Sequence, residues 1–178
     1  ARINDSRVLL DKVKAMISEA QINEAASNYI LAGIESEVYI SFIEYPVMYA
    51  SVRGTAIEEQ GIGDYWTITD GYTLREDAVS LSNPEYAGLL MRYCFYINER
   101  KAKESGAEYK MPTTFEAMYA ELAAFYEADQ RDFVLYSLLC NFIKTGKEIE
   151  RADAIYNDYK EKYNKNKGYI EILDTILE

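Results

Sequence analysis

The chain contains no histidine among its 178 residues. Histidine is the usual general base near neutral pH and the commonest ligand for transition metals in proteins. Its absence excludes histidine-dependent catalytic triads and histidine-bearing zinc centres within this chain. We therefore expect no catalytic residue, no metal site and no cofactor here.

Cysteine is almost as scarce, because Cys94 and Cys140 are the only two. They lie far apart in the sequence, so there is no C-x-x-C motif of the kind used in redox or zinc sites. Each sits in an apolar run of helical character. We expect buried, inert thiols; a disulfide between packed helices is the alternative, which spacing alone does not decide.

Basic residues are few relative to acidic ones, 19 against 30, which gives a net charge of -11. Nucleic-acid binding needs a basic footprint, and so does docking on anionic membranes. We expect neither partner. The acidity is interpreted as solubilising surface charge, with attraction to a cationic partner as the alternative.

Long apolar runs are also missing, and none reaches the length of a membrane span. There is no signal peptide in the printed sequence. We interpret the start at Ala1 as the result of leader removal, and the end inside a helical pattern at Glu178 as a sign that further domains follow.

The motifs that carry common chemistry are absent as well: no P-loop, no G-x-G-x-x-G and no nucleophile elbow. Several acids occur in close pairs, but adjacent or i,i+2 acids on a helix point apart. We expect all of them on the solvated surface: Glu58 and Glu59, Glu35 and Glu37, Glu148 and Glu150.

Apolar residues at helical spacing fill most of the chain and predict an all-α fold with seven or eight helices. The expected architecture is a helical bundle or an array of antiparallel helical hairpins. We expect one domain over 1–178, alternatively divided into N-terminal helices 1–59, a loop 60–83 and a helical array 84–178. No 34-residue repeat supports a tetratricopeptide array.

The N-terminal part predicts a helix to about Glu19 and a second one from Glu24. Residues 38–45 are β-branched and aromatic enough to form a strand, but the unbroken helical period favours helix. Pro46 is expected to kink or break this helix. Helix is expected to resume from Val47 to about Glu59.

Residues 60–83 contain three glycines and predict a long, irregular, partly ordered loop, in which Tyr65–Thr69 is the most strand-like run and a short hairpin is the alternative. Asp64 and Asp70 are the candidate ligands for a hard cation, but the spacing of a calcium loop is absent. We prefer no ion there.

The C-terminal half carries strong helix signals. Asn83 and Pro84 predict a helix start, and the helix should end before Gly106. Thr113 and Glu116 match a capping box. Two further helices are expected to meet at Gly146, the first capped by Asp129 or Asp132, and a last short helix covers 169–177.

Tyrosine is unusually common, with 17 residues against one tryptophan. We interpret most tyrosines as core or rim residues that keep their hydroxyls in water. The alternative is an aromatic surface that stacks on sugars or takes a peptide. Trp66, beside Tyr65 in the loop, is the candidate ligand-binding residue, with ordinary loop packing as the competing interpretation.

The run Ser82–Tyr86, followed by the helical pattern from Phe115 to Tyr163, resembles the helical region before the thioredoxin domain in TlpA/ResA-type thioredoxin-like proteins of Bacteroidetes. The likeness covers residues 80–178 and, more loosely, the N-terminal helices. In that family a C-terminal domain carries a W-C-x-x-C pair. Cys94 and Cys140 do not match it, so no catalytic residue is carried over.

This resemblance implies a non-catalytic helical accessory region of a periplasmic or extracellular thiol-disulfide oxidoreductase, which shapes partner docking. The alternative is a stand-alone helical module that binds a glycan or a peptide through an aromatic surface. An enzyme acting through carboxylates of the 60–83 loop is a third hypothesis, which we consider weakest.

Overall fold

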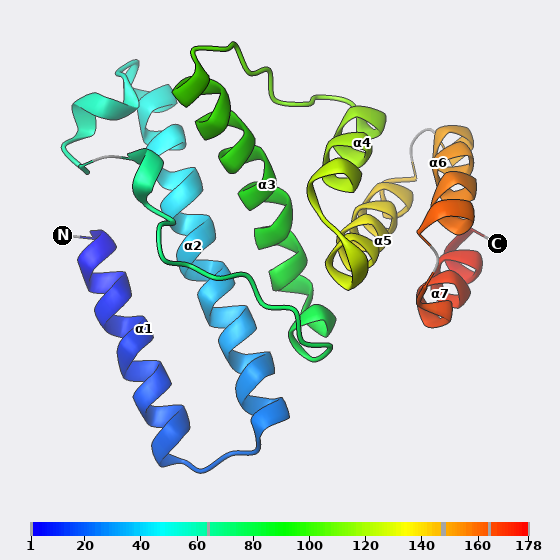
Figure 1. The fold of residues 1–178 in the computed structure, drawn as a ribbon, viewed down its shortest axis with the longest axis horizontal. Coiled ribbons are helices and arrows are strands. Elements are labelled where there is room, and N and C mark those ends of the chain that lie inside the picture. Colours follow the sequence, from blue (N-terminus) through cyan, green and yellow to red (C-terminus); the bar gives the residue numbers. More distant parts are fainter. Residues whose placement is uncertain (1, 64, 147–148, 164, 178) are drawn as a thin grey trace. The chain divides into compact units, whose positions relative to one another are not determined.

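The computed structural model describes residues 2–63, 65–146, 149–163 and 165–177 (Figure 1). Over these ranges it is all-α, as the sequence predicted, with no strand. The helices are α1 (Arg2–Glu19), α2 (Glu24–Arg53), α3 (Pro84–Ser105), α4 (Phe115–Phe125), α5 (Ala128–Lys144), α6 (Ile149–Lys162) and α7 (Lys167–Leu177), and three short 3₁₀ helices cover Ile57–Gln60, Tyr65–Thr67 and Ser80–Ser82.

The chain forms two compact units, Ala1–Glu108 and Tyr109–Glu178. The first holds α1, α2 and α3, and the second holds α4 to α7. The expectation of one domain over 1–178, or of a division at 60–83, stays a prediction.

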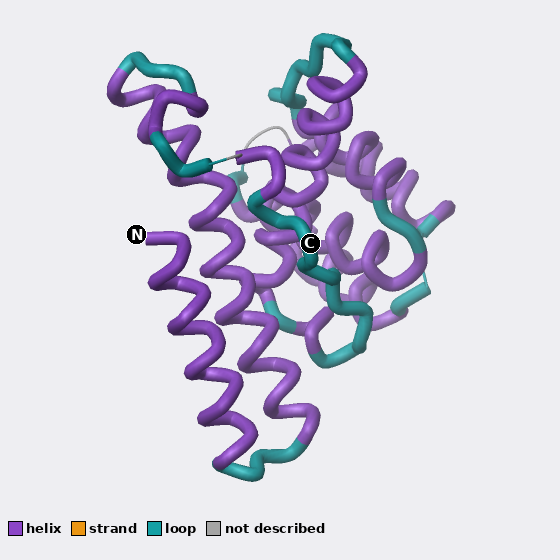
Figure 2. Tube along the Cα trace, turned by 60° about the vertical axis from the view of Figure 1, so that its left-hand side comes forward, coloured by secondary structure: helices purple, strands orange, loops and turns teal. Residues whose placement is uncertain are grey.

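In the first unit α1 and α2 are antiparallel, whereas α2 and α3 run parallel (Figures 1 and 2). The parallel direction follows from two contacts between α2 and α3 in which the residue numbers of both helices increase together. The Asn83 amide donates to the Tyr29 carbonyl at 3.0 Å, and Arg92 pairs with Glu44 farther along both helices. A parallel pair requires the connecting chain to return along the helices, which explains why residues 54–83 form so long a connection.

Helix α2 continues through Pro46 without interruption and ends at Arg53, where Gly54 has a φ of 63°. The alternative of a break at Pro46 and the resumed helix to Glu59 are therefore wrong, whereas the alternative of a kink at Pro46 stays a prediction. Proline lacks an N–H and crowds the preceding turn. Side chains of the following segment bond two carbonyls of the helix near this residue: Gln60 donates to the Pro46 carbonyl at 2.7 Å, and the Tyr65 hydroxyl to the Ile43 carbonyl at 2.8 Å. Helix at residues 38–45 is confirmed.

The strand-like run Tyr65–Thr69 forms no strand, and no hairpin is present in the described part of the loop. Tyr65–Thr67 is a turn of 3₁₀ helix, and Ile68 and Thr69 that follow are both buried. The segment is instead anchored on two helices. The Tyr65 carbonyl accepts a hydrogen bond from the Tyr96 hydroxyl of α3 at 2.8 Å, and the Tyr65 hydroxyl donates to a carbonyl of α2. Asp64 lies outside the described residues. Asp70 accepts from Arg100 at 2.6 Å.

Glu35 corrects the expectation that the paired acids lie on the surface, because only 4% of this residue is exposed. Its carboxylate accepts from Arg75 twice, at 2.8 Å from Nε and 3.1 Å from Nη2, and pairs with Lys14 at 3.2 Å. The bonds from Arg75 fix the connection 54–83, which we call the return segment, to α2. The pairing with Lys14 links α1 to the same carboxylate. Glu37, Glu58 and Glu59 are exposed as expected. Glu148 and the side chain of Glu150 lie outside the described residues.

In the second unit α5 packs against α4, α6 and α7. This central position explains why α5 carries apolar residues on most of its sides. The core is a set of fully buried side chains: Leu122, Val134, Leu135, Leu139, Ala152, Tyr159 and Leu173. Gly146 has a φ of 64°, as expected of the residue that ends α5.

Two caps in this unit differ from the sequence-based predictions. Thr114, not Thr113, is the residue before α4, and its hydroxyl accepts from the Ala117 N–H at 3.3 Å. Neither Asp129 nor Asp132 caps α5, because that helix begins one residue after Glu127, which makes no side-chain cap bond.

Asp132 is instead buried, with one carboxylate oxygen, Oδ2, accepting from the Asn166 N–H at 3.0 Å where α7 begins. Burial raises the pKa of Asp132, although hydrogen bonds from Tyr159 and Asn166 act in the opposite direction. Asp129 on the same helix adds to the rise, and Tyr159 and Tyr169 face it from α6 and α7. The other oxygen, Oδ1, is buried with no hydrogen-bond partner.

We expect Asp132→Asn to flatten the pH dependence of stability. A carboxyl whose pKa is raised on folding stabilises the fold most when protonated, so its contribution is present below the unfolded pKa, about 4, and is lost as pH rises through the folded pKa. As the pH rises between the unfolded and folded pKa values of Asp132, thermal unfolding followed by circular dichroism should show wild type losing stability relative to the variant. Parallel pH profiles for the two proteins would contradict it.

Both cysteines are buried free thiols, as expected. Several tyrosines are buried core residues, as expected, but the hydroxyls of some of them bond the protein rather than water. The Tyr86 hydroxyl accepts from the Arg75 N–H at 2.6 Å and donates to the Arg75 carbonyl at 3.1 Å. The Tyr159 hydroxyl donates to the Asp132 carbonyl at 3.3 Å. Tyrosine thus ties backbone segments together in both units.

Candidate functional site

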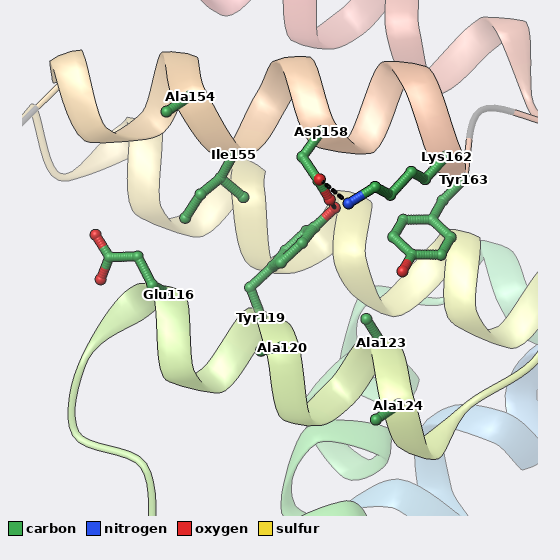
Figure 3. Close-up of a pocket in the computed structure, with 10 residues that line it drawn as sticks. All are labelled: Glu116, Tyr119, Ala120, Ala123, Ala124, Ala154, Ile155, Asp158, Lys162 and Tyr163. Carbon is green, nitrogen blue, oxygen red and sulfur yellow. Dashed lines mark hydrogen bonds and ion pairs between the residues drawn. The ribbon is translucent and has the colours of Figure 1, made fainter.

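The second unit has an open groove of about 500 Å³ between α4 and α6 (Figure 3). Helix α4 contributes Glu116, Tyr119, Ala120, Ala123 and Ala124, and the other wall is Ala154, Ile155, Asp158, Lys162 and Tyr163. Its size lies within the range typical of ligand sites. We call it the α4–α6 groove.

The groove exists because the α4 face toward it carries small side chains. Ala120, Ala123 and Ala124 are spaced i, i+3 and i+4, which places them on one side of the helix. The large residues Phe115 and Leu122 are buried in the core instead. Methyl groups therefore form the floor on the α4 side, which allows close approach by another molecule.

Asp158 is the polar centre of the groove. Its Oδ2 accepts from the Tyr119 hydroxyl at 3.1 Å, and its Oδ1 pairs with the Lys162 ammonium. Burial, with the nearby Asp158 charge, raises the pKa of Tyr119, so this hydroxyl stays a neutral donor. The hydrogen bond to Asp158 raises the pKa of Lys162, which keeps its positive charge. Figure 3 shows these three side chains converging.

Glu116 of the groove forms a second ion pair, with Arg151. The Arg151 Nε donates to Glu116 Oε1 at 2.6 Å, and this pairing lowers the pKa of Glu116 to about 2. A carboxyl ionised at all physiological pH values cannot act as a general acid. Near Tyr163, the Arg131 guanidinium lies 5.3 Å from the ring centre and Tyr119 is in edge contact at 6.4 Å. The arrangement offers an apolar floor, aromatic walls and charged rims, which suits binding.

The sequence-predicted residues Trp66 and Tyr65 lie elsewhere, in the first unit. Tyr65 is 4% exposed and packs edge-on against Trp66 and Tyr96. The Trp66 ring is stacked on Tyr96 at 5.9 Å between ring centres, and the Lys103 ammonium lies over it at 4.7 Å. A hollow of about 190 Å³ adjoins Trp66, Arg100 and Lys103. A ligand that stacks on the indole would compete with these contacts, and a ligand-binding role for Trp66 and Tyr65 stays a prediction.

Sequence reasoning missed every residue of the α4–α6 groove as a site. The available signal was the alanine spacing in FEAMYAELAAF, where small residues occupy a helix face that could have been polar. Asp158 and Lys162 were visible only as an ordinary i,i+4 pair. Their joint position opposite Tyr119 depends on the packing of α4 and α6 on α5, which the sequence pattern does not specify.

Among the described residues, no three or more cysteine, aspartate or glutamate side chains are grouped to hold a metal ion. Within the same ranges, none of the helices combines the length and the apolar character needed to cross a membrane. Comparison of the chain with models of known protein families, with curated proteins and with solved structures found no match.

Proposed function

We propose that this chain is a non-catalytic helical binding module that docks a short polypeptide segment in the α4–α6 groove. The observation that carries the proposal is the groove itself, an alanine floor with aromatic walls between two helices. Grooves of this kind accept an amphipathic helix, whose apolar side chains at i and i+3 or i+4 enter the floor.

Charge indicates the chemistry of the partner. The chain carries a net charge of -11, so a basic segment is attracted at long range and an acidic one is repelled. On the rim, the Asp158 and Glu116 carboxylates already hold Lys162 and Arg151. A basic partner side chain can exchange with Lys162 on the Asp158 carboxylate. We therefore assign the occupant as an amphipathic helix with a small apolar face and basic flanks.

A polypeptide ligand is preferred to a glycan for a physical reason. Sugars bind by stacking on open aromatic faces, whereas the Trp66 ring already has Tyr96 stacked on it at 5.9 Å and the Lys103 ammonium over it at 4.7 Å. Tyr119 in the groove is buried as well.

The test is selection of a displayed library of random 16-residue peptides on the immobilised chain, followed by fluorescence anisotropy with the enriched peptides. We expect basic, amphipathic sequences with micromolar dissociation constants. If no peptide is enriched, or if only acidic or non-periodic peptides are enriched, the proposal is contradicted.

We further propose that the module is the accessory region of a thioredoxin-like protein of the cell envelope and helps to dock its partners. The support is the resemblance of Ser82–Tyr86 and of 115–163 to the helical region of that family. The test is the genomic coding sequence beyond Glu178. A following strand-rich segment with W-C-x-x-C is expected, and a stop codon or an unrelated domain would end this part of the proposal while leaving peptide binding standing.

A further inference from the structure

Lys162 occupies the charged end of the α4–α6 groove. Its ammonium pairs with the carboxylate of Asp158, four residues earlier on α6, and Figure 3 shows its side chain running back along the helix to reach that carboxylate. The Lys162 side chain is 59% exposed, whereas that of Asp158 is 33% exposed. The lysine is therefore the more exposed member of the pair, and the carboxylate is the more covered one.

The position of the Asp158 carboxylate does not depend on Lys162 alone. Its Oδ2 also accepts a hydrogen bond at 3.1 Å from the hydroxyl of Tyr119, which belongs to α4 on the other wall of the groove. Tyr119 is only 6% exposed, and burial raises the pKa of its hydroxyl, so it remains a donor at physiological pH. A carboxylate accepts several donors at once. The Oδ1 atom is therefore the place where Lys162 and an incoming cation compete.

We propose that Lys162 is a built-in competitor of the ligand, which holds the place on Asp158 that a basic side chain of the bound segment takes. This inference rests on the proposed peptide binding and specifies how that binding is controlled. Lys162 can give way at little cost, because its ion pair is confined to one helix. Its exchange for a ligand side chain breaks no contact between α4 and α6, and the Tyr119 hydroxyl still holds the carboxylate.

The competition is modest because the ion pair is exposed. An i,i+4 ion pair on a helix surface shifts an equilibrium by about twofold, and a like charge at that spacing acts against a bound cation by a similar factor. Removing the Lys162 charge takes away both effects, so the affinity for a basic peptide should rise about fourfold. Salt screens exposed charges, so this gain should largely disappear at about 0.5 M salt.

The test compares wild type with Lys162→Gln, using fluorescence anisotropy at low salt and the basic peptides enriched from the displayed library on either protein. Lys160→Gln is the matched control, because it removes the same charge from the same helix. Lys160 pairs with Asp174, and neither residue lines the groove. We expect about fourfold tighter binding for Lys162→Gln and a change of less than about 1.5-fold for Lys160→Gln.

Two further measurements isolate charge exchange on Asp158. A peptide whose basic residues are replaced by glutamine should bind Lys162→Gln no more tightly than it binds wild type. In an Asp158→Asn background, Lys162→Gln should no longer strengthen the basic peptide, because the carboxylate for which the two cations compete is gone. A gain that persists in either measurement would overturn the proposal.

Failure of the competition is distinguishable from failure of peptide binding. Peptides that bind wild type, but bind Lys162→Gln no more tightly or gain equally from Lys160→Gln, would overturn the competition and leave peptide binding standing. A library that yields no peptide on wild type or on Lys162→Gln would overturn both proposals.

Discussion

Replacing Glu35 with alanine is expected to lower the free energy of unfolding by about 3–5 kcal/mol, the range seen when one partner of a buried ion pair is removed. Glu35 accepts two bonds from Arg75 and pairs with Lys14. Its loss leaves the Arg75 guanidinium, with 18% of its side chain exposed, without that countercharge. The connection between the return segment and α2 weakens at the same point. Urea unfolding followed by Trp66 fluorescence measures the effect, because Trp66 is the only tryptophan in the chain.

Glu37→Ala is the matched control, since Glu37 is an exposed acid on the same helix. We expect it to change stability by no more than about 0.5 kcal/mol. The double variant Glu35→Ala/Arg75→Ala should lose less than the sum of the two single losses, because no unpaired charge remains buried. Additive losses, or a Glu35→Ala effect as small as that of Glu37→Ala, would show that the pair does not hold the segment.

Filling the α4–α6 groove with Ala120→Trp is expected to weaken peptide binding at least tenfold. Ala120 is exposed and lines the groove, so an indole there occupies the space of the ligand without entering the core. Fluorescence anisotropy with a peptide selected on wild type gives the dissociation constants.

Ala15→Trp provides the control, because Ala15 is an exposed alanine of α1 and lies outside the groove. It should bind the peptide as wild type does. Equal affinities for Ala120→Trp and wild type would place the binding surface elsewhere on the chain.

The helices themselves were predictable because their signals are local. Asn83 and Pro84 start α3, and Gly106, with a φ of 73°, ends it. The apolar period of residues 24–45 correctly outweighed strand propensity. Pro46 led to the wrong prediction of a helix break, because the sequence does not show that Gln60 and Tyr65 bond carbonyls near it.

The arrangement of the helices and the candidate site were not predictable, because both depend on long-range contacts. Glu35 looks like a surface acid until Arg75, 40 positions later, is placed against it. The parallel run of α2 and α3 follows from how the return segment is anchored, for example by the Tyr86 hydroxyl on Arg75. The groove requires α4 and α6 to flank α5, after which the alanines and Asp158 acquire a common location.

The most direct test of the binding surface is an NMR titration of the ¹⁵N-labelled chain with a selected peptide. The account predicts amide shift changes concentrated at Ala120, Ala123 and Tyr163, with the indole N–H of Trp66 unmoved. Changes centred on Trp66 and Lys103 would contradict the account and move the binding surface to the hollow beside the indole.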